Sequence, residues 1–172
     1  MANVKHGVVR TDKMTGTDVR SELVSLRYSA NNAFADIDNG NVVVLGALET
    51  GKREVYTAAA PTASADFKAV ALVASPEVMY DERLRNLEDF YNEAGTIARG
   101  YRLHDHDIFS VTIDALDGKT TPEVGDVVEL KAGTKLNVAA SLTSGSTQIG
   151  KIIDINIVGK KTYYAIEVAC AG

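Results

Sequence analysis

Residues 153–168 read IDINIVGKKTYYAIEV, and this stretch decides the fold class. Apolar and polar residues alternate on both sides of a turn at 158–161. The alternating apolar positions are Ile153, Ile155 and Ile157 before the turn and Tyr164, Ile166 and Val168 after it. Successive side chains of a strand point to opposite faces, so each run predicts a β-strand with one apolar face. Two such runs joined by a short turn predict a β-hairpin.

The same period of two recurs upstream of this hairpin. Strands are expected at 106–115, 127–131 and 136–140, and residues 141–147 are small and polar, as in a loop. Asp117-Gly118 is a strong turn signal. Short strands separated by turn residues about every eight to twelve positions are typical of a small barrel or sandwich.

The N-terminal half is rich in β-forming residues but less regular. Strands are expected near 42–45, 55–60 and 67–74, with a turn at 38–41. Apolar residues at three- and four-residue spacing predict one short helix over about 82–93, and an ordered loop is the alternative.

The sequence therefore predicts a mainly β protein with at most one or two short helices. We expect a flexible N-terminal arm at 1–20, a β-rich N-terminal lobe at 21–75 and a barrel- or sandwich-like C-terminal lobe at 76–172. Met14–Asp18 is expected to lie outside the core. The alternative is a single domain in which both halves share one sheet system.

Composition and charge limit the function classes. The 172 residues are 45% hydrophobic and 24% charged, as in an ordinary globular protein. The formal net charge is -5, and residues 1–60 hold seven basic and seven acidic residues, so the acidic excess lies in 61–172. An acidic chain without a long apolar run predicts neither a nucleic-acid nor a membrane partner. The near-neutral N-terminal part is the expected face toward another protein.

The most suggestive cluster for chemistry is His104-Asp105-His106-Asp107. Imidazoles and carboxylates bind divalent metals, and on a strand the two histidines would share one face. A further ligand would have to come from elsewhere, and His6 is the other histidine. The alternative interpretation is a polar loop that leads into the next strand. We therefore assign no metal, no cofactor and no catalytic residue.

The single cysteine, Cys170, excludes an internal disulfide and a cysteine-rich metal cluster. It follows an alternating strand close to the C-terminal residue, and it is expected to be a packing residue or a tail thiol rather than a nucleophile.

Four segments carry a resemblance to a known family. They are AGTIARGYRL at 94–103, DIFSVT at 107–112, VGDVVEL at 124–130 and GKIIDI at 150–155. Together they resemble the small head decoration (cement) proteins of tailed bacteriophages. The likeness covers roughly residues 90–170 and, more loosely, 42–74.

This resemblance implies a non-enzymatic virion structural protein, assembled in the host cytoplasm, that binds the outer surface of a phage capsid and stabilises it. It implies the major capsid protein as partner and a homo-oligomer, with a trimer suited to threefold capsid positions. Two other functions stay open from the residues. One is a carbohydrate- or host-surface-binding β module. The other is a metal-dependent enzyme that uses His104 and His106 with a carboxylate such as Asp107.

Overall fold

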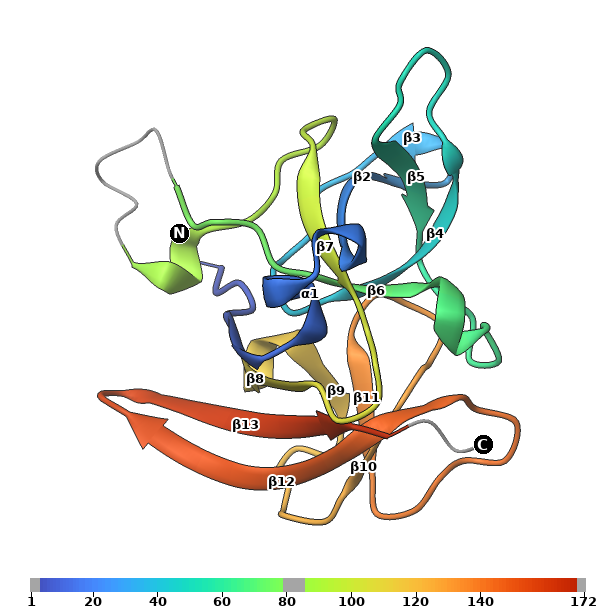
Figure 1. Ribbon diagram of the computed structural model, residues 1–172. Coiled ribbons are helices and arrows are strands. Elements are labelled where there is room, and N and C mark those ends of the chain that lie inside the picture. Colours follow the sequence, from blue (N-terminus) through green and yellow to red (C-terminus); the bar gives the residue numbers. More distant parts are fainter. Residues whose placement is uncertain (1–3, 79–85, 170–172) are drawn as a thin grey trace.

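The protein is built around two β-sheets that lie against each other, as Figure 1 shows. The computed structural model describes residues 4–78 and 86–169. The predicted mainly β fold is confirmed, because the described helical structure is one short helix and four single 3-10 turns. These are α1 (Thr15–Asp18), η1 (Arg20–Glu22), η2 (Phe67–Ala69), η3 (Leu87–Asp89) and η4 (Ile113–Ala115).

The first sheet closes on itself into a five-stranded barrel. Its strands pair in the order β2-β5-β4-β6-β7, and β7 returns to pair with β2. β2 and β5 are parallel, and the other neighbours in the barrel are antiparallel. The strands are β2 (Leu23–Ala30), β4 (Val42–Leu48), β5 (Val55–Ala59), β6 (Val70–Val73) and β7 (Ala98–Arg102), with the short β3 (Ala33–Phe34) paired to β2.

The second sheet is open and curls into half a barrel. Its strand order is β1-β8-β13-β12-β10-β11-β9. The strands are β1 (Val9–Lys13), β8 (Ile108–Thr112), β9 (Leu116–Gly118), β10 (Val127–Glu129), β11 (Leu136–Ala139), β12 (Gln148–Val158) and β13 (Lys161–Val168). The hairpin predicted at 153–168 is confirmed, because β12 and β13 pair in register from Val158↔Lys161 at the turn.

A glycine on β7 lets a buried leucine of the neighbouring strand β2 pack inside the barrel. Leu26 is fully buried in the barrel interior. A Cβ at Gly100 would lie 2.6 Å from Cδ2 of Leu26, which is closer than two carbon atoms can approach. Gly100 therefore leaves the space that Leu26 fills.

The two sheets share a core, and this explains the continuous apolar run of β6 and of the first residues of β4. In β6, Ala71 and Val73 belong to the barrel interior, whereas Val70 and Leu72 belong to the core shared with the second sheet. A strand buried on both faces is apolar at every position instead of every second one. The strand expected over 67–74 is therefore a fully buried one, and the first three residues of that range form η2.

The expected arm at 1–20 contains structure where it is described. β1 pairs with β8, with Val9 opposite Val111, and α1 follows it directly. The prediction that Met14 lies outside the core was wrong, because its side chain is 2% exposed and packs in the shared core. The pairing of β1 with a strand about a hundred residues away places Met14 there.

The expected helix at 82–93 lies partly outside the described residues. Residues 86–93 form η3 and then an extended chain rather than a continuing helix. Asn92 pairs with Ile37 in an antiparallel bridge, which holds the backbone in an extended conformation. The expected lobe boundary at residue 75 does not separate the two sheets. β7 follows that boundary but completes the barrel, and β1 precedes it but joins the second sheet.

A buried carboxylate on β10 accepts hydrogen bonds from β11 and from the loop that follows it. Glu129 is 2% exposed, and it accepts hydrogen bonds from the backbone N–H and hydroxyl of Thr143 and from Nδ2 of Asn137. Burial alone would raise the pKa of Glu129, but these hydrogen bonds outweigh burial and hold the pKa below its ordinary value. The charged carboxylate thereby fixes the loop after β11 to β10.

We predict that Glu129→Gln lowers the free energy of unfolding at pH 7 by about 1–3 kcal/mol, because a hydrogen-bonded buried charge is lost. The folded-state pKa of Glu129 is depressed, so its stabilisation is present above the ordinary pKa of 4.5 and is lost as pH falls through the lower folded-state value. Urea unfolding from pH 7 to pH 3 should show the wild type and the variant converging at acid pH. Glu123→Gln, at an exposed carboxylate, is the control and should change stability by under about 0.5 kcal/mol. A constant gap across the pH range would contradict the prediction.

Candidate functional site

The segment from His104 to Asp107 forms a turn between β7 and β8 rather than a strand. The φ angle of His106 is +69°, so the two imidazoles do not share a strand face. His104 Nε2 lies 2.9 Å from Oε2 of Glu22, and His106 Nδ1 lies 3.5 Å from Oε1 of Glu167. The two histidines therefore face different carboxylates on different elements.

Asp107 has a structural part in this turn. Its buried carboxylate accepts hydrogen bonds from the backbone N–H and hydroxyl of Thr15, each at 2.7 Å, and from the backbone N–H of His104 at 3.0 Å. These bonds tie the start of α1 to the second sheet. Within residues 4–78 and 86–169, no three His, Cys, Asp or Glu side chains form a group that could hold a metal ion.

Cys170 lies outside the described residues, so its expected role as a packing residue or tail thiol stays a prediction.

Among the residues that the structure describes, no helix has the length and apolar character needed to cross a membrane.

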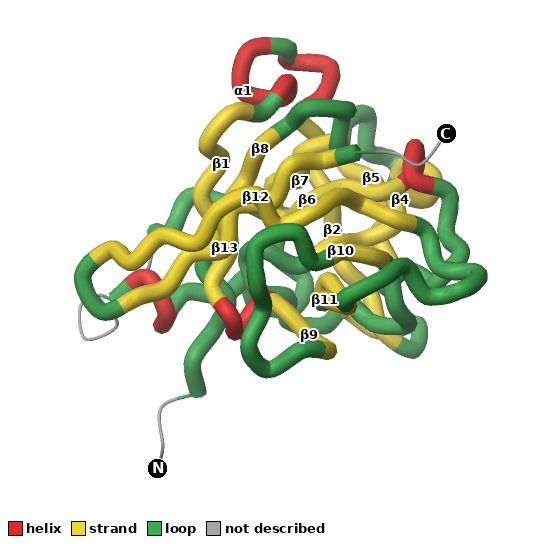
Figure 2. The backbone as a smooth tube through the Cα atoms, turned by 90° about the horizontal axis from the view of Figure 1, so that it is seen from below, coloured by secondary structure: helices red, strands yellow, loops and turns green. Residues whose placement is uncertain are grey.

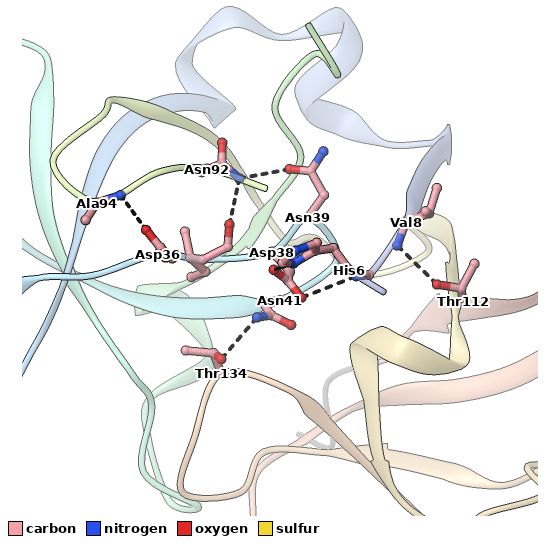
Figure 3. Close-up of polar contacts among 12 residues, drawn as sticks. His6, Val8, Asp36, Asp38, Asn39, Asn41, Asn92, Ala94, Thr112 and Thr134 are labelled. Atoms are coloured by element: carbon pink, nitrogen blue, oxygen red, sulfur yellow. Dashed lines mark hydrogen bonds and ion pairs between the residues drawn. The ribbon is translucent and has the colours of Figure 1, made fainter. Parts of the chain in front are cut away.

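The third histidine lies in a polar network between the two sheets, drawn in Figure 3. His6 Nδ1 lies 2.7 Å from Oδ1 of Asp38, and its ring stacks on Tyr91 with the centroids 4.8 Å apart. Two residues on, the backbone N–H of Val8 donates to the hydroxyl of Thr112 on the second sheet. The segment before β1 is thus bonded both to the loop that precedes β4 and to the second sheet.

Two buried asparagines continue this network on the barrel side. The side chain of Asn39 donates to the carbonyl of Ser75 at 2.8 Å and accepts from the Ser75 N–H at 3.0 Å. Asn92 Nδ2 donates to Oδ1 of Asn39 and to the carbonyl of Ile37 (Figure 3). Each bond satisfies a buried polar group, so the network holds three chain segments in fixed positions.

Small residues let the segments of this network pack closely. A Cβ at Gly7 would lie 2.9 Å from Cβ of Ala115, and a Cβ at Gly40 would lie 2.9 Å from the same atom. Gly40 also has a φ of +82°, which glycine adopts without strain. We name the contact of these three residues the Ala115 contact. It is a structural junction rather than a site for chemistry.

The β12–β13 hairpin exposes a group of apolar side chains. Figures 1 and 2 both show its closed end reaching the edge of the molecule. Ile157 is 76% exposed, Val158 is 53% exposed and Ile153 is 39% exposed, while Ile155 is partly buried against the core. Ile157 and Val158 are consecutive strand residues, so their side chains point to opposite faces of the hairpin. We name the exposed or partly exposed apolar side chains of this hairpin end, Ile153, Ile155, Ile157 and Val158, the hairpin patch.

Unequal strand lengths create this patch. β12 pairs with β10 only as far as Lys151, but with β13 as far as Val158. After Ile152, whose carbonyl accepts from the N–H of Gly125, one side of β12 has no neighbouring strand among the described residues. The alternation in the sequence predicts a strand face of isoleucines. It does not indicate that the neighbouring strand β10 ends before those isoleucines.

The free edge of β12 carries features that hinder pairing with another strand. A bulge lies between Ile152 and Asp154. The carboxylate of Asp154 accepts from the backbone N–H of Ile155 and from Nδ2 of Asn156, both at 2.9 Å. A bulge and a charged residue are common protections of an edge strand. The patch therefore offers its apolar side chains to a partner more than its backbone.

The other side of the hairpin is held firmly. β13 pairs with β8 along five residues, and the side chain of Lys161 at the turn is hydrogen-bonded to Glu88. This bond lowers the pKa of Glu88 from its ordinary value. Arg10 lies over the ring of Tyr163 at 5.3 Å from its centroid. Exposed apolar side chains on a projecting element are typical of a protein-interaction surface.

Comparison of the chain with protein-family models, with curated proteins and with solved structures gives no significant match.

The polar network predicts a stability effect. Asn39→Ala should lower the free energy of unfolding by about 1–3 kcal/mol, because the backbone N–H and carbonyl of Ser75 lose their partner and the buried amide of Asn92 loses one of its two acceptors. Asn156→Ala removes an exposed amide that bonds only to Asp154 and should change stability by under about 0.5 kcal/mol. Urea denaturation followed by circular dichroism measures both variants. Equal, small effects would show that the Asn39 bonds do not hold the junction.

Proposed function

We propose that this chain is a non-enzymatic virion structural protein that binds the outside of a tailed-phage capsid and stabilises it. The observation that carries the proposal is the hairpin patch, a set of exposed apolar side chains at the projecting end of the β12–β13 hairpin. The resemblance of four segments to head decoration proteins supports it. The buried carboxylates Asp107 and Glu129 are consistent with it, because their oxygens are used in hydrogen bonds within the fold.

In this proposal the hairpin patch contacts the major capsid protein, in place of the near-neutral N-terminal part that the charge distribution favours. Burying Ile157 and Val158 would remove apolar surface from water, at about 25 cal/mol for each Å². The turn carries Lys160 and Lys161, with Asp154 nearby on β12, so the acidic excess of the chain does not extend to the hairpin end. A small apolar contact of this kind has low affinity in a single copy.

Repetition over a symmetric shell would compensate for weak single contacts. A homo-oligomer, for which a trimer at a threefold position is our expectation, engages several capsid subunits at once and gains avidity. A protein that binds the assembled shell but not the released subunits shifts the equilibrium toward the shell by mass action. This mechanism stabilises a capsid without any catalytic group.

The proposal is tested by co-sedimentation with emptied capsids of the cognate virus. We expect the wild-type protein to sediment with capsids and to raise their thermal disruption temperature. The double variant Ile157→Asn, Val158→Asn should bind at least about tenfold more weakly, because it removes apolar contact area while leaving the fold intact.

Leu48→Asn is the matched control, since Leu48 is an exposed apolar residue at the end of β4 on the barrel. This variant should bind like the wild type. Absence of wild-type binding would refute the proposed function. Unchanged binding by the double variant would refute the role of the hairpin patch.

A further inference from the structure

A polar cleft with a volume of about 540 Å³ lies at one end of the barrel. This volume falls within the range of about 300–1,000 Å³ that is usual for small-molecule sites. Its polar lining residues are Arg20, Ser21, Ser25, Arg53, Glu54 and Tyr56. Leu23 and Val24 add a small apolar part.

The parallel pairing of β2 and β5 builds this cleft. Ser25 lies opposite Val55, and parallel strands begin at the same end of a sheet. The turn η1, which precedes β2, and the loop that precedes β5 therefore come together. Arg20 reaches the cleft from η1, and Arg53 reaches it from the loop.

The two arginines of the cleft lack the partner that a neighbouring arginine has. Arg27, further along β2, has its Nη1 2.5 Å from Oε1 of Glu49. Within the described part of the chain, no ion pair joins Arg20 or Arg53 to a carboxylate. Guanidinium groups bind oxyanions through paired N–H donors, so these two are available to an anionic ligand.

The remaining polar groups narrow the class of ligand. Glu54 puts a carboxylate in the same cleft, where it would repel a bare anion but accept hydrogen bonds from hydroxyl groups. The hydroxyls of Ser21, Ser25 and Tyr56 can donate and accept. We propose that this cleft binds a small sugar phosphate, with the phosphate at Arg20 and Arg53 and sugar hydroxyls at Glu54.

Calorimetric titration of the full chain with glucose 6-phosphate, inorganic phosphate and glucose tests this proposal, which does not depend on the proposed capsid function. We expect saturable binding of glucose 6-phosphate, at least about tenfold weaker binding of inorganic phosphate and no binding of glucose. Arg20→Gln and Arg53→Gln should each weaken the binding of glucose 6-phosphate by about tenfold or more, because each removes a charge-assisted contact.

Lys52→Gln is the matched control, since it removes the same charge from the same loop at a residue that does not line the cleft. It should change the affinity by less than about twofold. Failure of glucose 6-phosphate to bind would overturn the proposal. An equal loss in all three variants would also overturn it, because that result indicates general charge attraction rather than a site.

Discussion

The rest of the structure depends on how closely the barrel can approach the second sheet at the Ala115 contact. Gly7 and Gly40 both press against the Cβ of Ala115, and neither leaves room for a side chain of its own. This approach lets one face of β4 and β6 enter the core of the second sheet. Because the two sheets share this core, the hairpin and the barrel cleft both project from elements that pack against each other.

Sequence patterns predicted the parts of the fold that are local in the chain. The alternation in 153–168 and its turn were enough for the β12–β13 hairpin, because strand and partner adjoin each other. The pairings that span long separations were not predictable in this way. Nothing in residues 9–13 indicates Ile108–Thr112 as the partner, and Met14 consequently looked like part of a polar arm. Apolar runs such as Val70–Val73 indicate burial but not which two cores the strand divides.

The candidate sites were less predictable than the fold, for a physical reason. His104 and His106 share a strand face only if the chain is extended, and the left-handed conformation of His106 turns the two rings toward different carboxylates. The hairpin patch arises from a difference in length between β10 and β12, and the cleft arises from strand starts brought together by parallel pairing. Pairings between segments that are distant in the chain cannot be inferred from a local sequence pattern.

The pairing of β1 with β8 also sets the order of events during synthesis. Val9–Lys13 emerges from the ribosome early, but its partner strand follows only about a hundred residues later. The barrel strands between them can pair first, because β7, the last of them, ends at Arg102 before β8 begins. In a nascent chain, Val9–Lys13 would therefore stay unpaired until Ile108–Thr112 is made. The pairing of β1 with β8 would thus be a late step for the N-terminal part of the chain, made only after the barrel strands can already pair.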